Sequence, residues 1–193
     1  MRAHTAFSAL RRTCAAAMLA LPALALAAYP EKPITIIVPF AAGGPTDVLT
    51  RVIAERMARE LAQPMIVENT PGAGGTVGNA RAARAKPDGY TVLAGNVGTL
   101  AASNSFYRKL PYDMHKDFVG IASIGDAPQI VSARKDFPPT GLEALHDYVK
   151  PQESKVTFGA AGVGSGSYLG GVLLNNALGL NVEAINYRGA GQA

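Results

Sequence analysis

The stretch "PITIIVPFAAGGPTDVLTR", residues 33–51, contains the pattern that decides the fold. Its β-branched apolar run, residues 33–38, predicts a buried strand. Two adjacent glycines follow the strand, and a helix is then predicted to begin with Thr46 as its N-cap and the Asp47 carboxylate in its first turn. A strand, a glycine-rich loop and a helix in this order predict an α/β fold built on a parallel sheet.

The same alternation continues along the chain. Further strands are predicted at 65–69, 91–96, 155–162 and 181–187, with two short strands inside 117–133 that residues 125–128 join. Further helices are predicted at 76–85, 140–150 and 165–179. Strands that alternate with helices indicate a sheet with helices on its faces.

Helical spacing also predicts how these helices are oriented and where they end. The first helix is expected to turn six apolar side chains inward: Val48, Leu49, Val52, Ile53, Met57 and Leu61. Thr140 and Glu143 have the spacing of a capping box at the start of the helix at 140–150. The last helix is expected to end at Gly179 and to turn four side chains inward: Leu169, Val172, Leu173 and Leu178.

The N-terminus has the pattern of a secretory signal peptide, which we assign to residues 1–27. Arginines near the start are followed by an uncharged apolar run, residues 14–28, that is shorter than the roughly 20 residues of a membrane-spanning helix. The small residues of Ala25-Leu26-Ala27 form an A-x-A cleavage site. The sequence therefore predicts export from the cytoplasm.

Composition excludes some classes of partner. The chain has 18 Lys and Arg and 14 Asp and Glu, for a formal net charge of +4. Three of the basic residues lie in the predicted leader, so the remainder has 15 basic and 14 acidic residues and a net charge of +1. That balance does not predict a nucleic-acid partner. The single cysteine, Cys14, is also in the leader, so no disulfide is expected.

Three glycine-rich loops follow predicted strands, at 40–44, 95–98 and 159–167. Because the carboxyl ends of parallel strands lie at one edge of a sheet, such loops commonly meet and bind a ligand there. Exposed N–H groups and the helix dipole at a helix N-terminus favour an anion. The alternative is that the glycines only permit tight turns.

Motifs for nucleotide binding and for catalysis are incomplete. No Gly-Lys pair exists for a phosphate-binding P-loop, and "GAGGTV" lacks the last glycine of the dinucleotide fingerprint. Ser165 and Ser167 lack the flanking glycines of the G-x-S-x-G hydrolase motif. His115 and His146 do not have metal-ligand spacing, and we expect both to be surface residues. We therefore predict no catalytic residue, metal or cofactor.

The sequence resembles the solute-binding receptors of tripartite tricarboxylate transporters, the Bug family. The matching blocks begin with "YPEKPITIIVPFAAGGPTDVLTR" and "VENTPGAGGTVGNARAARAKPDGYTVLAGN" and continue with residues 112–124 and 158–193. They cover nearly all of the chain after the leader. Tyr168 departs from the pattern, because the family usually has His there, and Ala41-Ala42 is a milder departure.

The resemblance implies a two-lobed α/β fold of the type II periplasmic-binding-protein kind, incomplete here, with parallel or mixed sheets and flanking helices. Lobe 1 would comprise residues 28–127 without its C-terminal return segment, and residues 128–193 would be the first part of lobe 2. The implied protein is a periplasmic monomer without enzymatic activity. It would capture a small carboxylate between the lobes and deliver it to the membrane subunits of a tripartite transporter.

The predicted ligand-binding residues come from the glycine-rich loops and the positions beside them. They are Phe40, Ala42, Gly43, Thr46, Asp47, Asn96, Thr99, Gly162, Gly164, Ser165 and Ser167. Two alternatives stay open: a secreted hydrolase-like α/β enzyme whose catalytic part is absent, and a truncated product without function.

Overall fold

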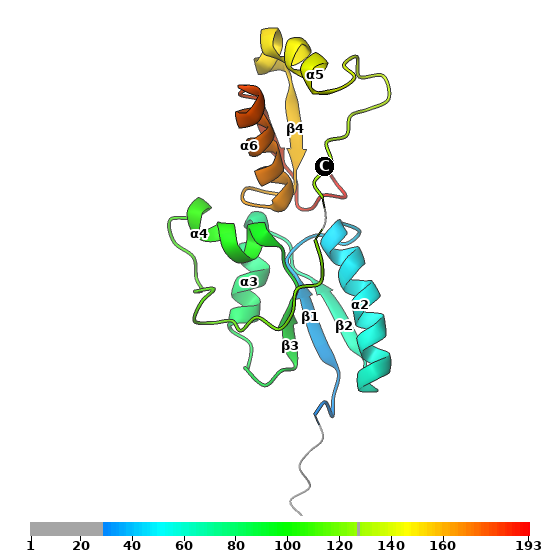
Figure 1. The fold of residues 1–193 in the computed structure, drawn as a ribbon. Helices are drawn as coiled ribbons and strands as arrows, with labels where there is room; N and C mark the ends of the chain where they lie inside the picture. Colours follow the sequence, from blue (N-terminus) through cyan, green and yellow to red (C-terminus); the bar gives the residue numbers. More distant parts are fainter. Residues whose placement is uncertain (1–28, 127) are drawn as a thin grey trace, which may run out of the picture. The chain divides into compact units, whose positions relative to one another are not determined.

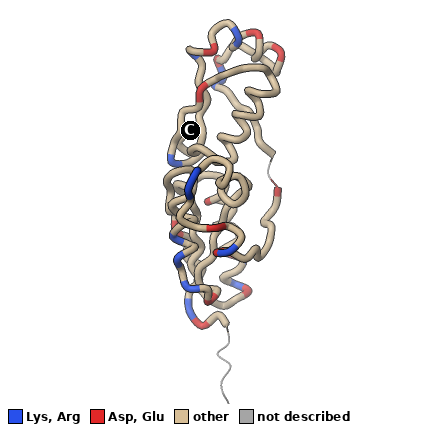
Figure 2. The backbone as a smooth tube through the Cα atoms, turned by 90° about the vertical axis from the view of Figure 1, so that its left-hand side faces the viewer, with Lys and Arg blue, Asp and Glu red and all other residues tan. Residues whose placement is uncertain are grey.

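The structure is a computed structural model that describes residues 29–126 and 128–193 (Figure 1). The predicted signal peptide, 1–27, lies outside the described residues. Among the described residues, no helix combines the length and the apolar character needed to cross a membrane. Acidic and basic residues are interspersed along the described backbone (Figure 2).

The first sheet contains three parallel strands in the order β2-β1-β3, namely β1 (Ile34–Val38), β2 (Met65–Asn69) and β3 (Thr91–Leu93). Ile36 of the central strand lies opposite Val67 and Val92 in the register. Burial on both faces explains why β1 is a continuous apolar run. The predictions at 33–38 and 65–69 are confirmed, and the strand predicted at 91–96 is shorter.

Two helices connect these strands. Helix α2 (Pro45–Leu61) contacts β1 and β2, and helix α3 (Thr76–Ala83) contacts β1 and β3. The chain moves from β1 outward to β2 and then back across β1 to β3, so right-handed connections place the two helices on opposite faces of the sheet. This arrangement confirms the predicted α/β class.

The predicted start of α2 is wrong, and so is half of its predicted inward face, because only Ile53, Met57 and Leu61 of the six side chains are half-buried. The N-cap is Gly44, with Pro45 as the first helical residue, so Thr46 lies inside the helix. Proline at the first helical position is favoured because its missing N–H has no intrahelical partner there. The buried residues of α2 are Asp47, Thr50 and Ala54, whereas Val48, Leu49 and Val52 are exposed.

The second sheet pairs β4 (Thr157–Ala160) with β5 (Glu183–Asn186) in parallel. Helix α6 (Gly166–Leu178) connects the two strands and contacts β4. Gly179 ends α6 in a left-handed conformation, as predicted, but Leu173 is exposed instead of buried.

The segment before β4 contains helix α5 (Leu142–Val149) and the 3₁₀ segment η3 (Lys150–Lys155). The helix predicted at 140–150 is therefore confirmed, but its capping box is wrong. Gly141 is the N-cap, and no side chain forms a capping hydrogen bond there.

Shorter helical segments lie in the connections: η1 (Ala73–Gly75) precedes α3, whereas η2 (Gly98–Ala102) and α4 (Ser103–Phe106) follow β3. The described residues of 117–133 form neither of the two predicted strands. A strand is defined by hydrogen bonds to a neighbouring strand, and this segment lies along neither sheet. The apolar pattern of 117–133 therefore predicts strands that would form only beside a neighbouring strand.

Substitution of Gly78 would test how closely α3 packs against the end of β1. A Cβ at Gly78 would lie 2.8 Å from the Pro39 Cα and 2.9 Å from the Thr70 carbonyl oxygen. Alanine favours a helix by up to about 1 kcal/mol, but overpacking against backbone costs about 1–3 kcal/mol. We expect Gly78→Ala to lower the free energy of unfolding, measured by urea denaturation.

Gly170→Ala is the matched control for that variant. In α6 the added Cβ would meet only the Gln129 side chain, at 3.6 Å or more, so helix propensity should dominate and stability should be unchanged or higher. Equal effects of the two substitutions would contradict the packing of α3 described here.

Candidate functional site

The loops that follow the strands of the first sheet contact the loops that follow the strands of the second sheet. After β1, the loop at 40–44 contacts residues 188–191, which follow β5. The Ala41 N–H donates a hydrogen bond of 3.3 Å to the Arg188 carbonyl oxygen. A Cβ added to Gly189 would lie 2.9 Å from the Ala41 Cβ, so the two loops are in direct contact.

The loop after β3 contacts the loop after β4 even more closely. A Cβ added to Gly98 would overlap the Gly164 carbonyl oxygen and would lie 2.8 Å from the Ser165 carbonyl carbon. The backbones of the two loops approach each other here because Gly98 carries no side chain.

A third contact joins η1 to the loop after β4. A Cβ on Gly74 would overlap the Val163 carbonyl oxygen. The Tyr107 hydroxyl lies between the same two loops, 2.8 Å from the Ala73 carbonyl oxygen and 3.0 Å from that of Val163. It has one proton, so it donates to one of these carbonyls at a time.

The buried carboxylate of Asp47 lies at the N-terminus of α2 and is 2% exposed. It accepts hydrogen bonds from the Gly43 N–H at 2.8 Å, the Asn69 amide at 2.8 Å and the Arg51 guanidinium at 3.1 Å. Burial alone would raise its pKa, but the hydrogen bonds and the positive charge of Arg51 outweigh burial and lower the pKa to about 2. The anion at this helix N-terminus is therefore one of the protein's own side chains.

The N-terminus of α6 is organised by hydroxyl groups instead of a carboxylate. Ser165 is the N-cap, and its hydroxyl accepts a hydrogen bond of 3.2 Å from the Tyr168 N–H. The Ser167 hydroxyl accepts a bond of 3.0 Å from the Ala161 N–H and lies 3.2 Å from that of Ser165. Gly162 and Gly164 turn the chain with positive φ angles of 102° and 81°. No acidic residue occurs in the first turn of α6.

Asn96 and Thr99 form a closed turn after β3. The Asn96 side-chain oxygen accepts hydrogen bonds from the N–H groups of Gly98 and Thr99, at 3.0 and 3.3 Å. The Thr99 side chain is 1% exposed, and its hydroxyl bonds to the Asn96 backbone. Both side chains therefore support the shape of the loop in this structure.

The remaining predicted residues differ in their exposure. Phe40 is 5% exposed and belongs to the core, so its side chain does not face the loops' surface. The Gly43 N–H is bonded to Asp47, whereas Ala42 is exposed. Thr46 is half-buried, and its carbonyl oxygen accepts a bond from the Thr50 hydroxyl.

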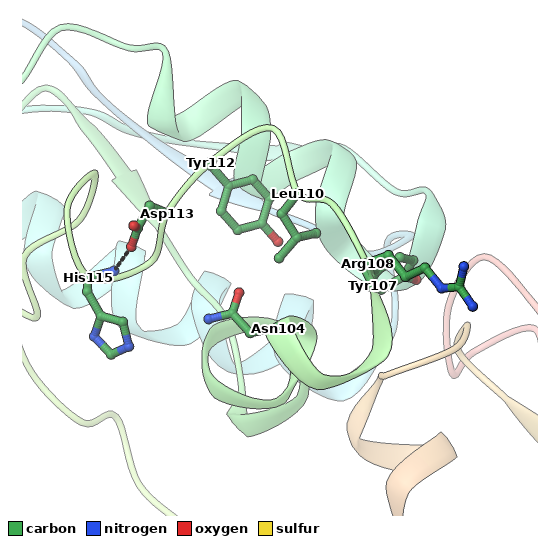
Figure 3. A pocket seen from close by; sticks show the side chains of 7 residues that line it. All are labelled: Asn104, Tyr107, Arg108, Leu110, Tyr112, Asp113 and His115. Atoms are coloured by element: carbon green, nitrogen blue, oxygen red, sulfur yellow. Dashed lines mark hydrogen bonds between the residues drawn. The ribbon is translucent and has the colours of Figure 1, made fainter.

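Two hollows in the described residues lie beside the loop contacts, and the first shares Tyr107 with them. One, of about 360 Å³, is lined by residues of α4 and the following loop: Asn104, Tyr107, Arg108, Leu110, Tyr112, Asp113 and His115 (Figure 3). The other, of about 250 Å³, lies along α2 and β2. The described residues contain no group of three or more His, Cys, Asp or Glu placed to hold a metal ion.

The loops after the strands of both sheets, which contact one another as described above, form what we call the loop cluster. Three parts of it were not among the residues predicted from sequence: residues 72–75, residues 188–191 and Tyr107. The first two are glycine-containing loops after β2 and β5, so applying the rule for carboxyl ends of strands to every strand would have found them. Tyr107 had no such signal, because its role depends on where the hydroxyl lies relative to two distant loops.

The contact at Gly98 can be tested by substitution. Gly98→Ala would place a methyl group against the backbone at Gly164 and Ser165, and overpacking of this kind costs about 1–3 kcal/mol. We expect lower stability and faster hydrogen exchange at residues 164–169. Gly120→Ala is the control, because no atom lies within 4 Å of its added Cβ. Unchanged exchange in Gly98→Ala would mean that the loops do not touch.

The Asp47 network makes stability depend on pH. The pKa is lowered from 3.8 to about 2 in the folded protein, so the stabilisation is fully present above about pH 5 and is lost as the pH falls toward 2. That shift corresponds to about 2 kcal/mol. We expect Asp47→Asn to lose about 2 kcal/mol at pH 7 and much less near pH 2.

The measurement is urea denaturation of the wild-type chain and the variant at several pH values. Glu55→Gln is the control, because the Glu55–Arg59 pair is exposed and should contribute little. A cost of Asp47→Asn that stays the same at every pH would contradict the assignment.

Comparison with known proteins identifies the family. Residues 49–193 match the family described as "Tripartite tricarboxylate transporter family receptor". A UPF0065 protein of Bordetella pertussis is 40% identical over 96% of this chain and 58% of its own length. Protein BugT of the same species is 35% identical over 86% of this chain and 51% of its own length.

Solved structures that are similar to this chain are periplasmic or ligand-bound proteins of the same kind. MatC from Rhodopseudomonas palustris, solved with bound malate, has a TM-score of 0.81 and 40% identity over 85% of this chain and 56% of MatC. A second R. palustris protein, solved with adipate, has a TM-score of 0.81 and 30% identity over 85% of this chain and 55% of its own. The periplasmic binding protein BugD has a TM-score of 0.74 at 37% identity.

The chain spans about half the length of the relatives it matches. The periplasmic-binding-protein fold and the Bug resemblance predicted from sequence are confirmed. This chain belongs to the receptor family of the tripartite tricarboxylate transporters.

Proposed function

We propose that this chain is part of an extracytoplasmic receptor that binds a small carboxylate and delivers it to a tripartite tricarboxylate transporter. Membership of the receptor family carries the proposal, and the relatives solved with malate and adipate support the class of ligand. Both compounds are dicarboxylates. The predicted signal peptide, 1–27, and the periplasmic relatives support a periplasmic location.

Of the two helix N-termini near the loops, that of α6 is the better position for the ligand carboxylate. At α2 the Asp47 carboxylate already occupies the N-terminus and would repel a second anion. At α6 the cap is the neutral Ser165 hydroxyl, and no acidic residue lies in the first turn. The donors would be the hydroxyl of Ser167 and backbone N–H groups between 162 and 167, except that of Ser165, which already donates to the Gly162 carbonyl oxygen.

The polar remainder of the ligand would be bound by the facing loops. Asn96 lies close to the start of α6, because a Cβ on Gly166 would be 3.9 Å from the Asn96 side-chain nitrogen. Phe40, Ala42, Gly43, Thr46 and Thr99 remain proposed as part of the surrounding surface, with Phe40 and Thr99 acting through their backbone because their side chains are buried.

Ligand entry requires the loops to separate. In the structure the Gly98 backbone lies against Gly164 and Ser165, so a carboxylate could enter there only after this contact opens. Each hydrogen bond to the charged ligand contributes about 1.5–3 kcal/mol, and these bonds must offset an association cost of about 4–15 kcal/mol. We therefore propose a hinge motion between a lobe at 28–127 and a lobe at 128–193.

The balance between hydrogen bonds to the ligand and the free-energy cost of association predicts weak binding by this chain alone. With donors from about half of a receptor, we expect a dissociation constant on the order of 1 mM, which corresponds to about −4 kcal/mol. Titration of the ¹⁵N-labelled chain with malate or adipate, followed by NMR, should shift the amide signals of residues 162–168 most strongly. The ligand should remain unchanged in the same spectra, because a receptor does not consume it.

Neutral diamides of the two acids are the matched control ligands, and they should cause no shifts at the start of α6. Shifts confined to the hollow around Asn104 and Tyr112 would contradict the proposed site. Loss of the ligand signal with appearance of a product would favour the enzyme alternative. A chain that binds neither acid up to about 50 mM would favour the product without function.

A further inference from the structure

We propose that Tyr107 is a positioning residue for ligand binding: its hydroxyl fixes the turn at 162–165 in the orientation that makes the Gly164 N–H a donor to the ligand carboxylate. The inference rests on the proposed function, because it requires a carboxylate to bind at the start of α6. The effect of Tyr107 on the turn itself can be measured without a ligand.

The segment before α6 is a β-turn whose central peptide has two possible orientations. The Ser165 N–H donates a hydrogen bond of 3.1 Å to the Gly162 carbonyl oxygen, which closes the turn. Gly164 has a φ angle of 81°, and Val163 is not among the non-glycine residues with positive φ. A negative φ followed by a positive φ defines the type II form. The type I form keeps the closing bond but rotates the central peptide by about 180°.

The sequence permits both forms of this turn. Glycine readily adopts the positive φ that the type II form requires, and it adopts the negative φ of the type I form equally well. The orientation of the peptide between Val163 and Gly164 is therefore determined by its contacts. Because the C=O and N–H of a trans peptide point in opposite directions, a bond that holds the Val163 carbonyl also directs the Gly164 N–H.

Tyr107 supplies the hydrogen bond to that carbonyl. Its hydroxyl lies 3.0 Å from the Val163 carbonyl oxygen and 2.8 Å from that of Ala73. The Ala73 carbonyl also accepts a hydrogen bond from the Thr76 N–H. The Val163 carbonyl has no donor other than Tyr107 within 29–126 and 128–193, so it depends on the Tyr107 proton. Burial raises the pKa of the Tyr107 phenol, so the hydroxyl keeps this proton at neutral pH.

The opposite end of the same peptide is a free donor. Gly164 is buried, but its N–H has no hydrogen-bond partner in the part of the chain that the structure describes. A buried N–H without a partner is unfavourable, so a carboxylate that accepts from it gains affinity. The neighbouring Ser165 N–H closes the turn, and the Tyr168 N–H bonds to the Ser165 hydroxyl, so neither is available to the ligand.

NMR of the free chain tests the effect of Tyr107 on the turn. In the type II form the Val163 α-proton lies next to the Gly164 amide proton, whereas in the type I form the amide protons of the two residues lie together. We expect a strong nuclear Overhauser effect of the first kind in the unmodified chain. In Tyr107→Phe it should weaken by about half or more, and the effect between the two amide protons should appear. A role of Tyr107 in stability alone would not change this pattern.

Titration with malate tests the effect on the ligand. Loss of one neutral hydrogen bond changes an equilibrium by about fivefold, so Tyr107→Phe should bind malate about five times more weakly than the unmodified chain. The malate-dependent shift of the Gly164 amide should decrease with it. Tyr148→Phe is the matched control, because the Tyr148 ring packs against Phe137 and its hydroxyl has no hydrogen-bond partner among the described residues. It should change neither the turn nor the affinity.

The outcomes separate this inference from the proposed function. An unchanged Overhauser pattern in Tyr107→Phe overturns the role of Tyr107, whether or not malate binds. A reoriented turn with unchanged malate affinity also overturns the inference, because the Gly164 N–H would then not bind the ligand. An unmodified chain without malate-dependent shifts at 162–168 contradicts the proposed site and the role of the Gly164 N–H together, even when the Overhauser pattern changes as expected.

Discussion

The backbone contact between Gly98 and residues 164–166 is the constraint on which the loop cluster depends. The loop after β3 and the loop after β4 belong to different sheets and lie far apart in the sequence. They can touch main chain to main chain because Gly98 has no side chain. Any side chain there would separate the N-terminus of α6 from Asn96 and from the loop cluster of the first sheet.

The two helix N-termini in this region have different roles. At α2, the Asp47 carboxylate joins the loop after β1, the helix itself and the end of β2, through Gly43, Arg51 and Asn69. At α6, the cap is a hydroxyl, and the first turn has no acidic residue. The same backbone pattern, a glycine-rich loop before a helix, therefore stabilises the fold in one case and is available for an external anion in the other.

Sequence patterns correctly predicted those strands and helix ends that are determined by residues close together in the sequence. The strand at 65–69 has its predicted bounds because each of its five residues pairs with the buried central strand β1. Gly179 ends α6 as predicted, because glycine readily adopts the left-handed conformation there. The glycine-rich character of the contacting loops was also visible in the sequence, whereas their contacts join two different sheets. The family was predicted from whole blocks of sequence, such as residues 29–51, which carry more information than any single motif.

The predictions that were wrong depend on distant parts of the fold. Val48 and Val52 have the spacing of a buried face, but a helix buries whichever side meets its neighbours. The pattern at 117–133 predicts strands, and a strand requires a partner that the described residues do not supply. For the candidate site, the sequence identified the glycine-rich loop at 159–164 and the hydroxyls of Ser165 and Ser167 at the start of α6. It could not predict that Asp47 takes the anion position at α2 or that Tyr107 reaches two loops.

The contact at Gly98 can be measured directly by NMR in the unmodified chain. A Cβ on Gly98 would lie 2.9 Å from the Gly166 nitrogen, so one Gly98 α-proton must point at that amide. A strong nuclear Overhauser effect between the Gly98 α-proton and the Gly166 amide proton is the predicted result. Its absence, in spectra that show the expected effects within each loop, would contradict the account, because the two loops would then lie apart.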